Sequence, residues 1–404
     1  MNDLKNFTSI CIKCGACNTS CPTFLAVGGE GYSPRGRLAI IEEFAAGNLK
    51  LSPRLKEIIF TCILCNSCTA NCPHEVSHEK AIVAAREAII KQEGIKPFER
   101  FIGHNINWLY PFLEIGLKTL GIGQNILNFN KKYFKFGKYF IPKMSLKPLV
   151  TRHQTIIKAE NEKHRVLFYA GCLINYVYPE IGQALINFLV KNNVTIILPQ
   201  NQKCCGIPAY ASGLLKPSLD LIYANLNSFE EHKKKYGYDY IVTACASCGA
   251  SLKGFHADNR PEFKDAYREV SNKTIDFSEF IVKILSYQGN SKGLPLQVTY
   301  HAPCHLHNVQ KVKESPITLI NSMFENNFIP MNDYDKCCGF GGTFSMKNPQ
   351  LSNLITEKKL QNIKETDADT VIVNCPGCLM HIETSCLKNN LPFKVKHLAG
   401  FLES

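Results

Sequence analysis

Cysteines at short, repeated intervals are the residues of this sequence best suited to chemistry. The chain has 404 residues, of which 19 are cysteines. In a short secreted chain such a number would indicate disulfides. In a long chain, cysteines grouped at tight spacings indicate metal or cluster ligation in a reducing compartment.

Two stretches near the N-terminus share the spacing C-x2-C-x2-C-x3-C-P. This pattern is typical of bacterial chains with two 4Fe–4S cubanes, in which three close thiolates bind one cluster and the fourth cysteine reaches the other. The spacing therefore predicts a first cluster on Cys11, Cys14, Cys17 and Cys72, and a second on Cys62, Cys65, Cys68 and Cys21. Structural zinc is the alternative, and eight cysteines in this twin arrangement argue against it.

The C-terminal part contains another cysteine pattern twice. Each copy reads Cys, then Cys-Cys-Gly, then Cys-x-x-Cys, and corresponding cysteines lie 130 to 133 positions apart. The two sets are Cys172, Cys204, Cys205, Cys245 and Cys248, and Cys304, Cys337, Cys338, Cys375 and Cys378. Two copies indicate a pseudo-twofold pair of units rather than a solenoid, which usually needs more repeats.

The adjacent cysteines of each copy suit an unusual metal centre. Their side chains diverge, so they fit a cluster of unusual shape, or two metals, better than one cubane. The glycine that follows each pair permits a left-handed backbone. Cys245 and Cys375 are expected at strand–helix junctions, where helix amides stabilise thiolates. Zinc or no metal in one or both halves, and disulfide exchange by the adjacent pair, are the alternatives.

The loops after the two pairs differ in stiffness. The glycine-rich stretch 339–342 could fold closely over a cluster, whereas Gly206-Ile207-Pro208 is stiffer. We therefore expect the second half to enclose a cluster more tightly, and the first half to hold zinc or a labile cluster.

Three histidines and one cysteine lie outside these patterns. His301, His305 and His307 flank Cys304, and we expect them to support the ligands or to pack. Cys386 has no counterpart in the repeat and is expected in the core.

Periodicity predicts a helical N-terminal module followed by α/β units. Helices are expected over 34–46, from 53 toward 60, and over 78–91. Short apolar runs at 166–170, 194–198 and 240–244, and again at 298–301 and 370–373, predict buried strands, with a helix over 317–324. Strands that alternate with helices imply parallel sheets. The expected fold class is α+β multidomain, with a helical ferredoxin at 1–95, a helical basic and aromatic linker at 96–163, and Cys-Cys-Gly domains at 164–290 and 291–404.

Positive charge concentrates in the linker. The formal net charge is +12, and residues 131–165 contain ten Lys or Arg and two Glu. This segment is either a solvated linker or a contact for anionic lipid or an acidic partner. Nucleic acid is disfavoured because no recognition motif accompanies the charge. Because neither an export signal nor a run of 18 apolar residues occurs, we expect a cytoplasmic protein, with the inner membrane face as one candidate contact.

The order of these motifs resembles a known family. A twin-cluster module followed by two Cys-Cys-Gly domains is similar to the iron–sulfur subunits of bacterial glycolate oxidase and anaerobic glycerol-3-phosphate dehydrogenase, and to heterodisulfide reductase. Cys21-Pro22-Thr23 and the stretch Ser33-Pro34-Arg35-Gly36-Arg37-Leu38 look most like the glycolate oxidase or D-lactate dehydrogenase branch. The resemblance covers nearly the whole chain, with residues 96–163 as the exception.

The resemblance implies a function for each motif. The eight N-terminal cysteines match two cubane sites, and the ten repeat cysteines match sites that hold non-cubane 4Fe–4S clusters in heterodisulfide reductase. The branch implies an electron-transfer subunit of a flavin-dependent 2-hydroxy-acid dehydrogenase, with FAD on a partner chain and a quinone or other acceptor. The alternatives are reduction of a disulfide at a non-cubane cluster and a zinc-containing scaffold. No FAD motif is evident here, and a catalytic residue is not assigned.

Overall fold

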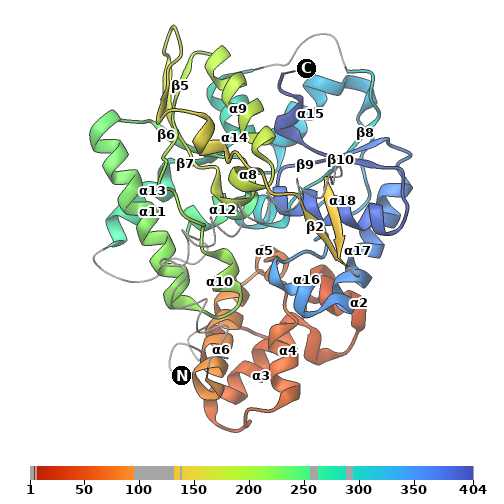
Figure 1. Ribbon diagram of the computed structural model, residues 1–404. Coiled ribbons are helices and arrows are strands. Elements are labelled where there is room, and N and C mark those ends of the chain that lie inside the picture. Colours follow the sequence, from red (N-terminus) through yellow and green to blue (C-terminus); the bar gives the residue numbers. More distant parts are fainter. Residues whose placement is uncertain are drawn as a thin grey trace.

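The computed structural model describes residue 4 and residues 7–94, 132–136, 139–254, 263–287 and 294–403. A helical module at the N-terminus lies below two α/β units that pack side by side (Figure 1). This arrangement confirms the expected α+β multidomain fold class. No helix among the described residues is long and apolar enough to cross a membrane.

The N-terminal module consists of short helices that begin at prolines or polar caps. They are α2 (Pro22–Val27), α3 (Pro34–Ala46), α4 (Pro53–Phe60), α5 (Ser67–Ala70) and α6 (His78–Glu93). Ser33 caps α3 by accepting a hydrogen bond from the Gly36 amide at 3.0 Å, and Pro34 takes the first helical position. Leu38, Ile41 and Ile82 then pack in one core between α3, α4 and α6.

The first α/β unit contains a five-stranded sheet in the order β3-β5-β4-β6-β7. The strands are β3 (Ile156–Ile157), β4 (His164–Phe168), β5 (Val194–Ile197), β6 (Tyr240–Thr243) and β7 (Thr274–Asp276). All neighbours are parallel except β3 and β5. The connecting helices are α8 (Gly171–Tyr176), α9 (Pro179–Lys191), α10 (Ile207–Ala211), α11 (Leu215–Tyr236), α12 (Ala246–Leu252), α13 (Lys264–Lys273) and α14 (Phe277–Glu279).

The second unit repeats this plan in a smaller parallel sheet, β10-β9-β8. Its strands are β8 (Val298–His301), β9 (Thr370–Val373) and β10 (Lys394–His397). The counterpart of β5 is reduced to a single parallel bridge between Val298 and Phe328. Its helices are the π-helix η6 (His305–Val309), α15 (Glu314–Phe324), α16 (Thr343–Lys347), α17 (Pro349–Lys364) and α18 (Pro376–Lys388).

The two units contact each other at the ends that carry the cysteines. The helix that carries the Cys-x-x-Cys motif of the first unit, α12, contacts η6 of the second, and α18 of the second contacts α8 of the first. One continuous hydrophobic core therefore includes strand residues of both sheets, such as Val242 of β6 and Val373 of β9. The pseudo-twofold repeat thus brings the two cysteine sets toward each other.

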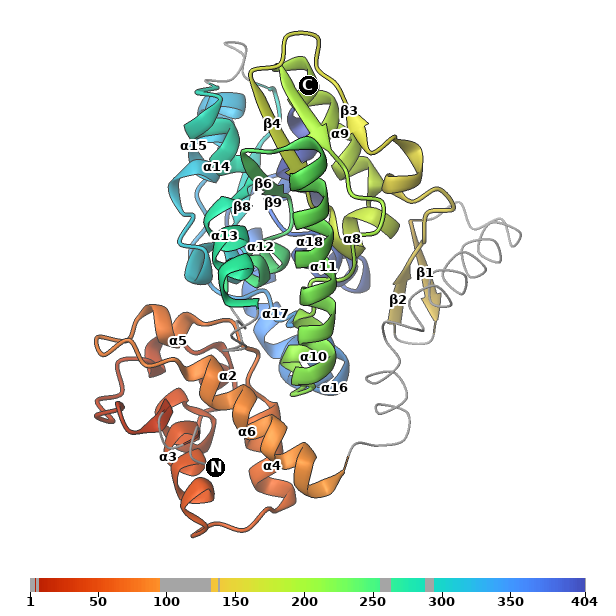
Figure 2. The same ribbon diagram turned by 90° about the vertical axis from the view of Figure 1, so that its left-hand side faces the viewer.

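The described part of the linker differs from the helical prediction, because it contains strands and, apart from them, the short 3-10 helix η3 (Leu149–Arg152). Strands β1 (Tyr133–Phe136) and β2 (Tyr139–Pro142) pair antiparallel, seen apart from the helical module in Figure 2. Aromatic residues, which are frequent in this stretch, favour strands over helix. Further along, β3 joins the first sheet, so the linker and that unit are continuous. Residues 95–131, which include Lys131, lie outside the described part of the chain.

Candidate metal centres

The eight N-terminal cysteines line two separate cavities. Cys11, Cys14, Cys17 and Cys72 line one cavity, and Cys21, Cys62, Cys65 and Cys68 line the other. Each cavity thus receives three cysteines from one motif and the last cysteine of the other motif. This is the exchange that the spacing predicts, and cluster binding by these cysteines stays a prediction.

The chemistry of the second cavity fits an anionic bound group. Arg37 and Arg86 are both buried, and their guanidinium groups donate to the backbone carbonyls of Ile58 and Ile59 rather than to a carboxylate of the described residues. Arg37 Nη1 lies 3.9 Å from Cys21 Sγ, and Arg86 Nη2 donates to the Cys62 carbonyl at 2.5 Å. Because a buried cation without a counter-ion is costly, four thiolates holding a cluster would balance these guanidinium groups.

Burial keeps thiols of both cavities in the protonated form. It raises the pKa of the Cys17 thiol to about 11, and the pKa of Cys65 rises further, with the nearby Cys304 as a second cause. Such thiols stay protonated at neutral pH unless a metal displaces the proton.

The five cysteines of the first half form a connected set. Cys204 interacts with Cys172 and Cys205, and Cys205 interacts in turn with Cys248. Cys205, Cys245 and Cys248 are buried, whereas Cys172 and Cys204 are partly exposed.

The five cysteines of the second half are linked in the same order and enclosed more fully. Cys337 interacts with Cys304 and Cys338, and the sulfurs of Cys338 and Cys378 are 3.6 Å apart. Of this set, Cys304 alone is partly exposed.

The glycine of each Cys-Cys-Gly motif is required by its backbone. Gly206 has φ +82° and Gly339 has φ +95°, in the left-handed region that side chains rarely adopt. A Cβ at Gly206 would lie 2.8 Å from the Ser218 carbonyl oxygen, and one at Gly339 would lie 2.6 Å from Thr356 Oγ1. The glycines let α11 and α17 approach the cysteine pairs closely.

Cys245 and Cys375 occupy the N-caps of α12 and α18, the expected strand–helix junctions. Their side chains interact with each other across the pseudo-twofold axis, and the hydrogen bond from Cys245 is the largest cause that lowers the pKa of Cys375. Backbone amides of Gly377 and Cys378 lower it further. The two cysteine sets are therefore in direct contact.

The second half also contacts the second N-terminal cavity. Asn308 Nδ2 donates to the Cys65 carbonyl at 3.0 Å, and His305 Nε2 lies 3.2 Å from the Leu64 carbonyl. Cys65 and Cys337 share a small hydrophobic cluster with Phe344. The cysteine sets consequently follow one another from the N-terminal module through the second half to the first.

The structure gives the flanking histidines different surroundings. His305 bridges Leu64 and Ser247, and His307 faces Asp335 at 3.8 Å. These contacts agree with the expected supporting and packing roles. His301 is different: it lies beside Cys338 and Cys378, and no spacing in the sequence marks it as a ligand. Cys386 is buried in the core, as expected.

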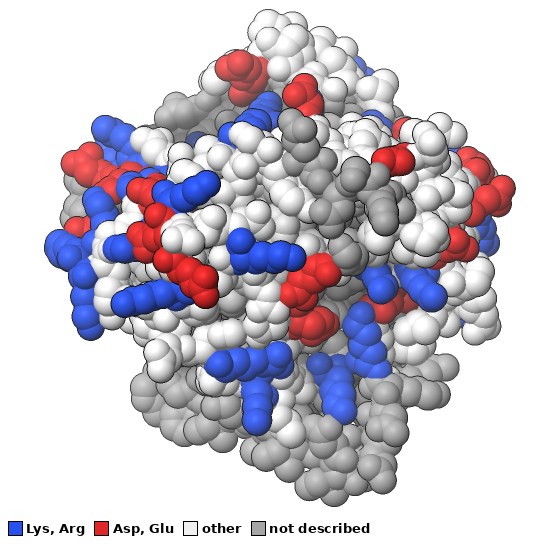
Figure 3. Space-filling view, turned by 90° about the horizontal axis from the view of Figure 1, so that it is seen from above, with Lys and Arg blue, Asp and Glu red and all other residues white. Residues whose placement is uncertain are grey.

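A groove beside the hairpin carries part of the basic segment. Its lining includes Lys143, Lys147 and Arg152. Lys132, which also lines the groove, is held by Glu383 at 2.7 Å and so joins the hairpin to α18. On the face shown in Figure 3, basic and acidic side chains are interspersed rather than gathered by sign.

Comparisons with known proteins match these parts of the chain. A 4Fe-4S dicluster domain family matches residues 8–76, and a cysteine-rich CCG domain family matches residues 166–253 and 298–383.

Three relatives span these regions. A CoM/CoB fumarate reductase subunit from Methanothermobacter marburgensis is 29% identical, over 97% of this chain and 71% of that protein. A probable glycolate oxidase iron–sulfur subunit from Bacillus subtilis is 26% identical, over 97% of this chain and 92% of that protein. Lactate utilization protein A from a Geobacillus species is 33% identical, over 59% of this chain and 99% of that protein.

Proposed function

Because the chain belongs to the family that joins a 4Fe-4S dicluster domain to two cysteine-rich CCG domains, and is an iron–sulfur electron-transfer protein, we propose a specific place for it. It is the relay subunit of a flavin-dependent 2-hydroxy-acid dehydrogenase. The partner flavoprotein oxidises glycolate or lactate, and this chain conducts the electrons to a quinone or another acceptor. The observation that carries the proposal is the unbroken succession of cysteine sets.

The residues of this chain position and insulate the bound groups. Iron–sulfur clusters, when bound, supply transfer of single electrons, which a two-electron flavin reaction needs. Cys11, Cys14, Cys17 and Cys72, and Cys21, Cys62, Cys65 and Cys68, would hold two 4Fe–4S cubanes. The ten repeat cysteines would hold one or two further clusters of non-cubane type, or zinc.

Hydrogen bonds between the units fix the spacing of these sites. Asn308 and His305 tie η6 to the loop that carries Cys65, and Gln310 Nε2 donates to the Ala246 carbonyl at 2.8 Å. This matters for a relay because the clusters that the thiolates would bind must stay at constant distances from one another. The basic groove at Lys143, Lys147 and Arg152 would meet the flavoprotein or an anionic membrane surface.

The test uses the tagged full chain, purified without oxygen from cells that also produce the proteins encoded by the adjacent genes. We expect a flavoprotein to copurify, and glycolate or D-lactate to bleach the visible absorption of the clusters. A Cys65→Ser variant should keep the partner but lose most of the bleaching. Absence of any flavoprotein, together with no bleaching by a panel of 2-hydroxy acids, would refute the proposal.

A second candidate is reduction of a disulfide at the repeat. The contact between Cys245 and Cys375 favours it, because it brings both cysteine sets to one place. One relative also carries the name of a CoM/CoB fumarate reductase subunit. Steady turnover of a disulfide panel with a chemical reductant would support this function, and no turnover with fully loaded protein would exclude it.

A further inference from the structure

We propose that His301 is a metal ligand in the second half, where one metal ion is bound by an imidazole nitrogen together with the thiolates of Cys338 and Cys378. The inference rests on the part of the proposed function that places a metal centre in this half. It does not depend on the flavoprotein. The metal is an iron of the bound cluster or a zinc ion, and both use the same three donors.

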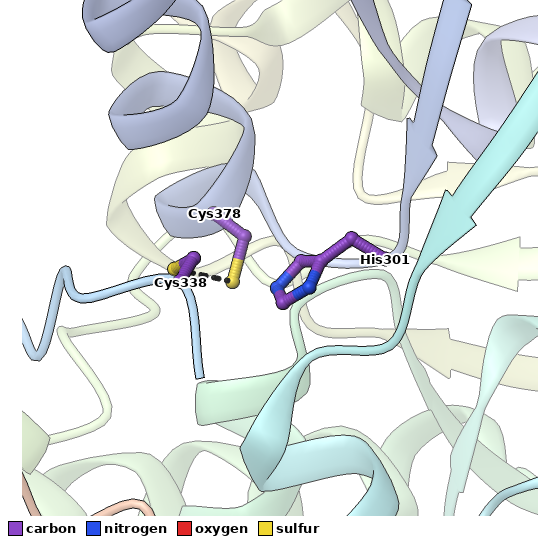
Figure 4. Close-up of side chains that lie close together, drawn as sticks. All are labelled: His301, Cys338 and Cys378. Carbon is purple, nitrogen blue, oxygen red and sulfur yellow. Dashed lines mark hydrogen bonds between the residues drawn. The ribbon is translucent and has the colours of Figure 1, made fainter. Parts of the chain in front are cut away.

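The three side chains converge from separate elements. His301 ends strand β8, Cys338 lies on the loop before α16, and Cys378 lies in the first turn of α18, as Figure 4 shows. Their donor atoms all lie within 4.8 Å of one another, and all three residues are buried. The two sulfurs are 3.6 Å apart. Two thiolates bound to one tetrahedral metal at about 2.3 Å would place their sulfurs about 3.8 Å apart.

The imidazole interacts with the side chain of Cys338, and no other polar side chain of the described residues bonds to it. His301 is fully buried, and neither ring nitrogen makes a hydrogen bond that satisfies distance and angle within the described residues. Buried polar groups in proteins are almost always satisfied. A metal ion between His301 and the two sulfurs would supply the missing interaction, since neutral imidazole is a frequent metal ligand.

The repeat itself provides a comparison. The 132-residue offset between Cys172 and Cys304 places Tyr169 of the first half at the position of His301. Tyr169 is buried too, but its hydroxyl donates to the Lys203 carbonyl at 2.7 Å. The first half therefore offers sulfur donors at this place, whereas the second offers nitrogen and sulfur. The two halves would then hold chemically different centres.

Charge also favours the mixed donor set. For a single divalent ion such as zinc, two thiolates and a neutral imidazole give no net charge, which suits a site whose three residues are at most 6% exposed. A further thiolate on the same ion would leave a buried negative charge.

The test begins with the wild-type full chain, isolated without oxygen and labelled with 15N-histidine. Metal analysis of the wild type and of Cys338→Ala first shows whether the second half contributes iron or zinc. For iron, pulsed electron paramagnetic resonance should show a directly bound nitrogen. For zinc, X-ray absorption at the zinc edge should show one nitrogen at about 2.0–2.1 Å besides sulfur at about 2.3 Å.

Variants then assign the nitrogen. His301→Phe should remove the nitrogen signal, and His307→Gln, a histidine of the same half outside the trio, should keep it. A wild-type centre with sulfur ligands only, or with the weak coupling of a hydrogen-bonded imidazole, would overturn the inference and leave the relay intact. A second half without any metal would overturn both.

Discussion

Burial favours the neutral form of single thiol and carboxyl groups in this chain. The thiols of Cys17 and Cys65 have raised pKa values, so these side chains are neutral until a metal binds. Binding must therefore release protons, and cluster loading should weaken as the pH falls. We expect the two four-cysteine sites of the N-terminal module, the cages, to be stable only when loaded, because folding and metal binding are coupled in such sites.

Loss of one cage cysteine should remove one cluster. Cys14→Ser takes away a thiolate of the first cavity, and we expect loss of about four irons per chain together with loosening of the helical module. Iron analysis and electron paramagnetic resonance would show a single remaining cubane signal. Cys386→Ser, a change at a buried cysteine outside all cages, should keep the iron. Two cubane signals in Cys14→Ser would refute the ligand assignment.

Asp276 should make stability depend on pH. Burial raises the pKa of its carboxyl group from the usual 3.8 to about 7. The folded state thus binds the proton more tightly than the unfolded state, so the stability is greatest at low pH and is lost as the pH rises through 7. Between pH 6 and pH 8.5 this residue should lower the free energy of unfolding by about 1 kcal/mol.

The matched variants separate this carboxyl group from the others. Asp276→Asn keeps a side chain that can cap α14 through the Ser278 amide, and it should flatten the change between the two pH values. Asp220→Asn, at a residue of the α11 surface paired with Lys216, should leave the pH dependence as in the wild type. Denaturation midpoints at both pH values provide the measurement. An equal slope in wild type and Asp276→Asn would contradict the assignment.

At the scale of elements, the π-helix η6 is one of the contacts between the N-terminal module and the repeat, and α10 of the first half provides another. The π-helix begins at His305, directly after Cys304, and side chains in and next to it contact the loop of Cys65 and the helix α12. One short element therefore touches all three parts that carry cysteines. Movement of η6 would alter two inter-site spacings together.

Removal of one contact of η6 should slow electron transfer from the N-terminal clusters to the second half. Asn308→Ala leaves the buried Cys65 carbonyl without its donor, which costs about 1–3 kcal/mol. We expect a lower thermal midpoint and slower reduction of the second half after the N-terminal clusters are reduced, followed by rapid mixing and optical detection. Asn187→Ala, on the exposed face of α9, is the control. Unchanged kinetics in Asn308→Ala would mean that η6 does not set this spacing.

The elements show which patterns a sequence reveals. Helices α3 and α4 were predictable because Ser33 and Ser52 cap them and prolines open them. Strand β9 at the centre of its sheet and its neighbour β8 were predictable because β-branched and aromatic residues make up most of these short runs. Strands β7 and β10 carry weaker signals: β7 has three residues, and β10 alternates exposed lysines with buried residues at a sheet edge.

At the sites too, some ligands can be recognised from the sequence and others only from the fold. Ligands spaced within a motif, such as Cys62 and Cys65, can be recognised locally. His301 meets Cys338 and Cys378 only because β8, the loop after Cys337 and α18 come together in the folded unit. The repeat offset to Tyr169 was a signal for this asymmetry, and it required comparison of the two halves.

At the scale of the whole molecule, the cysteine sets form one route rather than separate sites. The helical module lies beneath both α/β units in two perpendicular views (Figures 1 and 2). Cys65 shares a hydrophobic cluster with Cys337, and the second half meets the first at Cys375 and Cys245. Among the described residues, α10 of the first half also packs on the helical module, but the contacts between cysteine sets pass from the N-terminal sites to the second half and from there to the first half.

This order predicts unequal effects of equivalent changes. Cys338 and Cys205 hold the same place in the two halves, but Cys338 lies on the link and Cys205 lies beyond it. Cys338→Ala should abolish transfer from the partner to the final acceptor, while the N-terminal cubanes remain reducible. Cys205→Ala should lower activity less. The measurements are acceptor reduction, iron content and the resonance signals of the cubanes in each variant.

The outcome also shows whether the place of each half on the electron route matters, since both halves contain the same set of cysteines. If the second half is the link, Cys205→Ala still allows electrons to reach Cys375 and its neighbours, and Cys386→Ser serves as the control for a change at a buried cysteine. Equal loss of activity and iron in Cys338→Ala and Cys205→Ala would mean that the halves act symmetrically. Greater loss in Cys205→Ala would reverse the order, because the first half would then contain the indispensable site.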